Sequence, residues 1–452
     1  LAGGDTSPLR FHAAPSRFLD GFQANHNSTA DLLLIGMIAS ALALRLGAQH
    51  GAIPSRRGVV LGLAGGTSLL LALGTVLTAS RTGIALMPLA LVAAAAILWP
   101  WLRAGRRQLA LMLGIGGALV GLAALALQPL MAGLQWAAAL PGASLTLVPP
   151  PWPLAALALL GAVGLLLRGP WAWRVWALPL CLPALLWQPP RPALGQFELL
   201  AADVGQGNAV LVRTARHTLL YDAGPRYSPE SDAGHRVLVP LLAHLNERLD
   251  LLVLSHRDQD HIGGARAVLA MRPAARLLTT LPPGHALTQA RETEVCAAGQ
   301  SWVWDGVHFE VLHPQPGSDL QGKSNALSCV LRIEATGASA LLVGDIETAQ
   351  ERELLARGLA PVDWLLVPHH GSKTSSSGPF LQALQPGLAL VQAGYRNRFG
   401  HPAAEVLARY ESLSIALTDS ARCGALHWHS QAPRQWQCER EKARRYWHHR
   451  LP

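Results

Sequence analysis

Four side chains of the types that bind metal ions stand within six residues of one another. They are His256, Asp258, Asp260 and His261, and they follow the apolar run Leu251–Ser255, whose composition predicts a buried strand. A loop that leaves a strand and opens a helix can turn such closely spaced side chains toward one point. Imidazole and carboxylate together suit zinc or manganese, and the share of oxygen ligands favours the harder ion. We therefore predict a divalent metal site here.

Three later segments place further metal-binding side chains at or after predicted strands. Asp345 ends the run Leu341–Asp345, the pair His369 and His370 follows Leu365–Pro368, and His401 lies in Gly400-His-Pro402. Between and around these runs, β-branched and leucine-rich strands alternate with helical stretches, which predicts an α/β fold with polar clusters at its strand ends.

The segment from His256 to His261 resembles the HxHxDH signature of the metallo-β-lactamase superfamily, with Asp258 in place of the middle histidine. The resemblance implies that Asp345 bridges two divalent ions, manganese or zinc, and that one of the paired histidines closes the second site; we take this to be His369. Two ions held by carboxylates and imidazoles would supply a hydroxide and a clamp for a phosphoryl oxygen. Asp260 and Asp345 are the predicted catalytic residues.

Five more segments are similar to the C-terminal domain of the ComEC family, the inner-membrane channel of DNA uptake in natural transformation. These are 203–207, 221–224, 325–330, 369–376 and 395–402. The resemblance implies an αββα sandwich over residues 197–430 and a metal-dependent nuclease that degrades one DNA strand while the other is transported. DNA, the lipid bilayer and other competence proteins are the implied partners.

Polar residues beside the predicted metal site are candidates for substrate binding. Ser372 and Lys373 lie in a Gly/Ser-rich turn that suits a phosphate, and Asn325 and Ser328 begin a strand near the site. Arg396 and Arg398 either line a groove for a DNA strand or belong to a solvated loop. The predicted substrate-binding residues are Asn325, Ser328, Ser372, Lys373 and His401.

The first half of the chain has a different composition. Twelve basic and three acidic residues precede Glu198, and 25 of each sign follow from it, so the net charge of +9 lies wholly in the first half. The globular second half is therefore neutral overall, and the positive net charge does not come from it. Apolar runs near residues 31–46, 58–79, 83–102, 109–127, 152–167 and 173–187 predict six transmembrane helices.

The arginines predict how these helices are oriented. Eight lie in the loops at 45–57, 103–107 and 168–174, whereas the opposite loops carry only Arg81. The positive-inside rule places the former in the cytoplasm, and with six crossings both the segment 1–30 and the C-terminal domain lie outside. We therefore predict a multi-pass protein of the bacterial inner membrane, with helices over 31–187, a Pro-rich linker at 188–196 and a basic tail at 431–452.

Residues 17–90 additionally resemble the O-antigen ligase and polymerase family, through a segment containing Asn25-His-Asn27 and another containing Ser80-Arg-Thr-Gly83. Two functions thus stand beside DNA uptake: a superfamily hydrolase of a small ester or lactam, and a glycan-transfer membrane protein fused to a hydrolase. Whether the chain is a fragment or a fusion is left open. Cys423 and Cys438 would pair in an oxidising compartment, or all five cysteines are small buried side chains.

Overall fold

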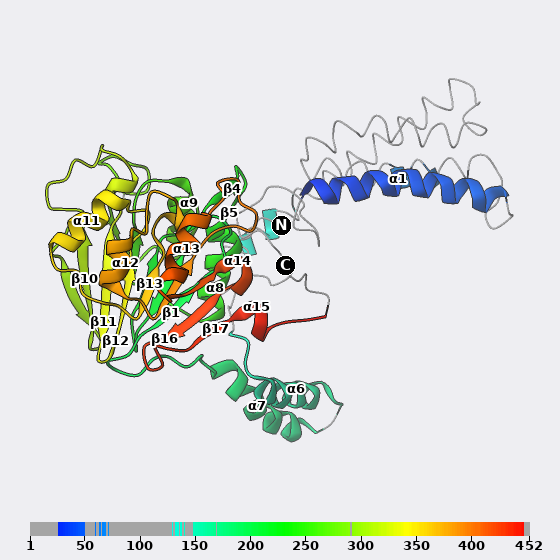
Figure 1. The fold of residues 1–452 in the computed structure, drawn as a ribbon. Helices are drawn as coiled ribbons and strands as arrows, with labels where there is room; N and C mark the ends of the chain where they lie inside the picture. The colour runs from blue at the N-terminus through cyan, green and yellow to red at the C-terminus, as the bar shows by residue number, and fades with distance from the viewer. Residues whose placement is uncertain are drawn as a thin grey trace. The chain divides into compact units, whose positions relative to one another are not determined.

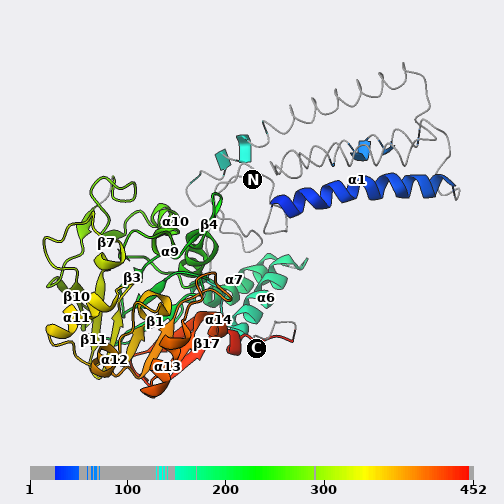
Figure 2. The ribbon, with the colours of Figure 1, turned by 45° about the horizontal axis from the view of Figure 1, so that its top comes forward.

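The structure is a computed structural model that describes residues 26–49, scattered positions between 59 and 140, and residues 148–446 except 169, 290 and 291. The chain divides into two units, 1–145 and 146–452. The first contains helix α1 (His26–Gln49), and the second begins with α6 (Trp152–Leu166) and α7 (Trp171–Leu186), drawn in Figures 1 and 2.

Helix α1 contains the first predicted span, and α6 and α7 cover all but the last residue of the fifth and sixth. Among the helices of the described residues, none combines the length and apolar character needed to cross a membrane. The predicted spans at 58–79, 83–102 and 109–127, and most of the O-antigen ligase-like segment, lie outside the described residues apart from isolated positions.

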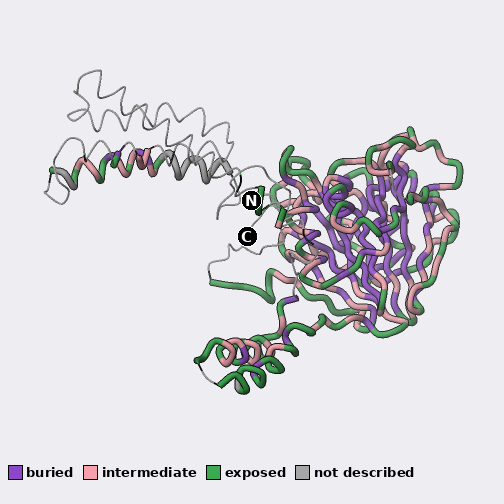
Figure 3. Tube along the Cα trace, turned by 180° about the vertical axis from the view of Figure 1, so that it is seen from behind, coloured by how far each residue is buried: buried purple, intermediate pink, exposed green. Residues whose placement is uncertain are grey.

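Helices α6 and α7 pack closely against each other while exposing apolar side chains. A Cβ on Gly161 would lie 2.7 Å from Cys181 Sγ and 2.8 Å from the Ala177 carbonyl oxygen, so only glycine permits this approach. On the outer faces Leu166 and Trp176 are 81% and 78% exposed, with many further leucines. The exposed residues of the pair, green in Figure 3, are therefore largely apolar.

The C-terminal part is built on two large sheets. The first, in spatial order, contains β17 (Trp436–Cys438), β16 (Leu426–His429), β1 (Glu198–Ala201), β2 (Val210–Arg213), β3 (Thr218–Tyr221), β6 (Leu251–Leu254), β7 (Arg276–Thr279) and β8 (Thr293–Val295). The second contains β15 (Ala416–Asp419), β14 (Leu388–Val391), β13 (Trp364–Leu366), β12 (Ala338–Leu342), β11 (Val330–Ala335), β10 (Val307–His313) and β9 (Ser301–Trp304). A small hairpin of β4 (Arg226–Ser228) and β5 (Ser231–Asp232) stands apart from both.

Alternation of side chains along the strands explains the layering. One face of each sheet contributes to a shared core that includes Phe197, Phe309 and Trp364. The outer face of the first sheet packs on η1 (Gly234–Leu238), α8 (Val239–His244) and α10 (Ala265–Met271), and that of the second on α11 (Thr348–Ala356), α12 (Gly378–Leu384) and α13 (Ala404–Ser412). The buried residues accordingly follow the strands in Figure 3. The predicted αββα sandwich is confirmed.

Parallel pairing brings the functional loops to one edge. Strands β3, β6, β7 and β8 are parallel neighbours, as are β12, β13, β14 and β15. The carboxyl ends of parallel strands meet at the same edge of a sheet, so the segments that follow β3, β6, β12, β13 and β14 lie together there.

Candidate metal centre

The metal-motif residues lie where β6 ends and the short helix α9 (Gln259–Ile262) begins. His256 and His261 are buried, whereas the side chain of Asp260 is 29% exposed and that of Asp258 is 44% exposed. A Cβ on Gly207 would lie 2.1 Å from the Asp260 carbonyl oxygen. The segment after β1 can therefore press against the motif only because position 207 is glycine.

Two groups of side chains could each hold a metal ion. One comprises His256, His261 and Asp345, and the other comprises Asp260, His261 and His370, with the ligand atoms of each within 4.8 Å of one another. His261 Nε2 lies 3.1 Å from Asp345 Oδ1, and His370 Nε2 lies 3.5 Å from Asp345 Oδ2 and 3.3 Å from Asp260 Oδ2. The structure thus gathers four sequence-predicted residues with His370.

The buried atoms at the centre of this cluster lack ordinary hydrogen bonds. Nε2 of His256, His261 and His370 and Oδ1 of Asp345 are inaccessible to solvent and have no hydrogen-bond partner of acceptable geometry in the described chain. Buried polar atoms are rarely left in this state, and these are the atoms by which imidazole and carboxylate bind metals. The donor set therefore fits divalent ions.

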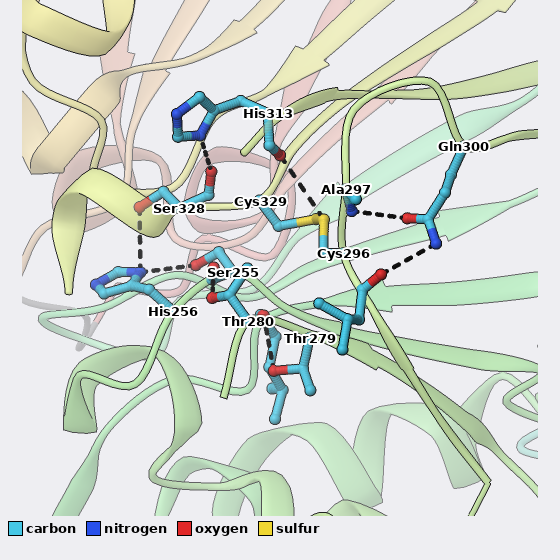
Figure 4. The surroundings of a disulfide bond; sticks show 12 residues. Ser255, His256, Thr279, Thr280, Cys296, Ala297, Gln300, His313, Ser328 and Cys329 are labelled. Carbon is cyan, nitrogen blue, oxygen red and sulfur yellow. Dashed lines mark hydrogen bonds between the residues drawn. A yellow bond between two sulfur atoms is a disulfide. The ribbon is translucent and has the colours of Figure 1, made fainter. Parts of the chain in front are cut away.

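The opposite edges of the rings are held by hydrogen bonds. His261 Nδ1 lies 2.7 Å from Asp222 Oδ2, and His370 Nδ1 lies 2.7 Å from the Gln392 carbonyl oxygen. His256 Nδ1 lies 2.9 Å from Ser255 Oγ and 3.4 Å from Ser328 Oγ, as Figure 4 shows. Such contacts set the tautomer and the direction of a metal-binding histidine.

Charge within the cluster keeps its carboxylates ionised. Burial alone would raise the pKa of Asp345, but the imidazoles of His261 and His370 hold it well below its usual value. Burial also opposes ionisation of Asp260, yet the contact with His370 at 3.3 Å and the charge of His261 lower its pKa to about 2. Conversely, burial disfavours the charged ring of His261, while Asp345 and Asp222 raise its pKa well above the ordinary value. Metal ions would replace these protons.

The paired histidines separate into different environments. Both have a left-handed backbone, with φ of 49° at His369 and 54° at His370. This turn directs His370 into the cluster, where it is 2% exposed, whereas the side chain of His369 is 20% exposed and contacts Asn325 and Thr374. His369 Nε2 still lies 3.8 Å from Asp345 Oδ2. His370, and not the predicted His369, joins the groups that could hold an ion.

The predicted substrate-binding residues surround the cluster unevenly. Ser328 Oγ accepts a hydrogen bond from the Asp345 amide at 3.0 Å, so it supports a ligand. Ser372 is buried and bonds to Thr374, and Lys373 instead forms an exposed ion pair of 3.0 Å with Glu405.

His401 and Asn325 lie beside the outer histidine. The ring of His401 is centred 5.8 Å from that of His369 and 6.5 Å from that of His370. Asn325 Nδ2 lies 3.3 Å from His369 Nε2. Two predicted residues thus border the cluster.

Sequence reasoning did not assign a role to Asp222. It follows β3 with φ of 58°, is fully buried, and accepts hydrogen bonds from the amide and hydroxyl of Ser255 at 2.7 and 2.8 Å. The available signal was its position inside 221–224, one of the family-like segments. A buried carboxylate at such a strand end needs partners, and here these are Ser255 and His261.

Two disulfides stabilise the sandwich. Cys423 pairs with Cys438, one of the two outcomes left open by the sequence, and Cys296 pairs with Cys329, which was not predicted. The second bond lies beside the metal cluster, since Cys329 follows Ser328 directly (Figure 4). Cys181 is a free cysteine.

Comparisons with known proteins agree with this geometry. A family model described as the metallo-beta-lactamase superfamily matches residues 202–394. Competence protein ComA of Neisseria gonorrhoeae is 37% identical over 281 residues, which are 62% of this chain and 39% of that protein.

Two further relatives have similar sequence identities. Recombination protein 2 of Haemophilus influenzae is 34% identical over 245 residues, covering 54% of this chain and 30% of that protein. ComE operon protein 3 of Bacillus subtilis is 33% identical over 260 residues, covering 52% and 33%. The match spans about a third of the length of these relatives. The C-terminal domain is of the metal-dependent hydrolase type.

Proposed function

We propose that this chain, which belongs to the ComEC family of competence proteins, takes part in DNA uptake and hydrolyses phosphodiester bonds of the strand that is not transported. The observation that carries the proposal is the buried cluster of unpartnered nitrogen and oxygen atoms at one edge of the sandwich. The names of the matched competence proteins direct it toward DNA.

The donor set supports two ions. The two groups share His261, whose free nitrogen, Nε2, can bind only one ion. Asp345 lies between the groups, with Oδ1 3.1 Å from His261 Nε2 and Oδ2 3.5 Å from His370 Nε2, so this carboxylate would be the ligand available to both ions. With carboxylates on both sides, manganese is favoured over zinc. Bound ions would supply positive charge for a phosphoryl oxygen and a nucleophile derived from water at neutral pH.

The protein's own side chains orient and hold the reaction site. Asp222 holds a proton at His261 Nδ1, and Gln392 does the same for His370, so both Nε2 atoms face inward. Asn325 donates to His369 Nε2 from beside the cluster, and burial lowers the pKa of His369, which keeps that ring neutral.

The enzymatic part of the proposal is tested with the full chain in detergent, using a fluorescent single-stranded oligonucleotide and manganese. Asp260→Asn should reduce hydrolysis at least about 100-fold, because one carboxylate of the cluster is lost. Asp363→Asn is the control, because Asp363 directly precedes β13 and so lies at the end of that strand opposite His369 and His370. Its side chain accepts a hydrogen bond from Ser339 N at 2.8 Å. Full activity of Asp260→Asn, or activity unaffected by chelators, would exclude the metal-dependent mechanism. Hydrolysis of a carboxylic ester without hydrolysis of DNA would favour the small-ester alternative.

We also propose an inner-membrane location with the hydrolase domain outside the cytoplasm. Three observations support it: the arginine distribution, the apolar outer surface of α6 and α7, and two disulfides, which persist in oxidising compartments. A domain outside meets duplex DNA before transport and can remove one strand. A reporter that fluoresces only in the cytoplasm, fused after Pro452, should stay dark. A bright reporter would contradict both the placement and the strand-removal mechanism.

A further inference from the structure

A loop beside the metal cluster carries two arginine–aromatic pairs. We call residues 394–401 the arginine–aromatic loop. Arg396 lies over the ring of Tyr395 at 5.2 Å, and Arg398 over that of Phe399 at 4.8 Å. Tyr395 and Phe399 are 46% and 52% exposed. Large rings on a protein surface usually have a binding role when they form a group.

The loop has a defined internal structure. Asn397 Nδ2 donates to the carbonyl oxygens of Gly394 and His401, and Asn397 Oδ1 accepts from the amides of Phe399 and His401, both at 3.1 Å. The Gly394 amide also donates to Gln206 Oε1 at 3.2 Å. One buttressing side chain thus holds the two arginine–aromatic pairs on either side of it, which argues against a merely solvated loop.

A cavity lies beside this loop. It has a volume of about 270 Å³ and is lined by Arg396 and His401 from the loop, by Asp419 at the end of β15 and by Arg422 of α14 (Ser420–Cys423). One lining residue, His401, has its ring centred 6.5 Å from that of His370 in the metal cluster. The volume suits one nucleotide unit better than a larger ligand.

The charges at this cavity favour a polyanion. Among the described residues, no carboxylate forms an ion pair with Arg396 or Arg398, and the pair between Arg422 and Asp419 is long, at 3.8 Å, with Arg422 73% exposed. Uncompensated guanidinium groups bind phosphate, often in bidentate fashion. Aromatic rings next to them give bases a stacking surface that is independent of sequence.

We propose that the arginine–aromatic loop and its cavity bind single-stranded DNA next to the reacting phosphate, with bases stacked on Phe399 and Tyr395 and phosphates held by Arg396, Arg398 and Arg422. This rests on the proposed nuclease function and specifies its substrate as an unpaired strand. Double-stranded DNA offers no exposed base faces for these rings, so a duplex binds more weakly.

Binding is measured separately from hydrolysis. The full chain in detergent is titrated into a 5′-labelled twelve-nucleotide strand with excess chelator, and fluorescence anisotropy is followed over a salt series. Arg396→Ala/Arg398→Ala should weaken binding and reduce the slope of log K against log salt by about 1.4, at about 0.7 per lost phosphate contact on single strands. Phe399→Ala should weaken binding by about 5- to 150-fold.

Controls separate charge, stacking and folding. Arg216→Ala/Arg434→Ala is the charge control, because it removes the same charge far from the arginine–aromatic loop. These two arginines lie near the start of β1, whereas Gln206, which contacts the loop, follows the end of β1. This variant should keep the wild-type slope. Phe399→Leu preserves an apolar side chain without a stacking face and should behave like Phe399→Ala. On an abasic strand, Phe399→Ala should bind as wild type does.

The outcomes distinguish this inference from the proposed function. Wild-type affinity and slope in both loop variants would overturn the inference, even if the chain hydrolyses DNA. Equal affinity of the wild type for duplex and single strand would also overturn it. Loss of binding in the loop variants supports it, even if no hydrolysis is found with any metal.

Discussion

The replacement of Asp222 by asparagine tests whether the buried carboxylate controls the metal centre through His261. Asp222 Oδ2 accepts from Nδ1–H of His261, and Oδ1 accepts from the Ser255 amide. An asparagine side chain cannot serve both. If its oxygen faces Ser255, its amide NH₂ meets His261 Nδ1, and the ring must move its proton to Nε2. If its oxygen faces His261, the NH₂ meets the backbone N–H of Ser255.

Each orientation has a definable cost, which falls on metal binding in the first and on folding in the second. A proton on Nε2 occupies the ligand position of the residue that both groups share. Loss of such an orienting partner typically weakens metal affinity about 10- to 100-fold. This corresponds to about 1.4–2.7 kcal/mol. The buried unsatisfied donor also lowers the free energy of unfolding by about 1–3 kcal/mol.

The assay is competition for manganese between the full chain and a chromogenic chelator, at pH 7.5. Folding is checked by near-UV circular dichroism with no metal present. Asp250→Asn is the matched control, because Asp250 accepts from Thr218 N at 2.8 Å just before β6, at the opposite end of the strand that leads to His256. An Asp222→Asn variant with both wild-type metal affinity and wild-type stability would refute this reasoning.

Three further expectations concern the domain's stability. Asp305→Asn should lower the free energy of unfolding by about 1–3 kcal/mol at pH 7, since Asp305 accepts from Thr214, Arg216 and His217 and joins turns of the two sheets. Burial opposes ionisation of Asp305, but these donors lower its pKa, so its contribution to stability is present above the ordinary aspartate pKa and is lost as the pH falls through the lowered pKa. Urea unfolding of wild type and variant at pH 7 and 3.5 tests this, and an equal difference in stability at the two pH values would contradict it. Replacing both Cys423 and Cys438 by serine, which opens a loop of 15 residues, should cost about 3 kcal/mol in urea unfolding under oxidising conditions; no loss would mean that the bond does not form. Arg191→Ala should increase hydrogen exchange in the linker, because Arg191 ties the linker to buried Glu247 at 2.8 Å, and unchanged exchange would argue against docking.

Strong local patterns made most of the sandwich predictable. The run Val307–His313 alternates buried and half-buried residues along β10, and the helical stretch Thr348–Ala356 forms α11. Strands β16 and β17 were not predicted. They are short, and β16 owes its position to pairing with β1, more than 200 residues earlier in the chain. Pairing over such a separation has no local signal.

The candidate site was predictable to the level of residue types at strand ends. Four metal-binding side chains within six residues identified the segment from His256 to His261, and the position of Asp345 at the end of a predicted strand identified that residue. The choice between His369 and His370 depended on a left-handed backbone at both positions, which non-glycine residues adopt only when the surroundings enforce it. The role of Asp222 depended on the side-by-side placement of β3 and β6, a tertiary property.

Two independent observations, the arginine distribution and the disulfides, support the proposed placement of the domain outside the cytoplasm. The arginine count orients the helices only if the number of crossings is right, and one crossing fewer between residues 152 and 187 would reverse the C-terminal side. The disulfides carry no such dependence, because their formation reflects the compartment of the domain itself. One of them fastens the chain directly after Ser328, which supports both His256 and the Asp345 amide. This disulfide thus fixes the chain beside the proposed metal centre, in agreement with the proposed placement outside the cytoplasm.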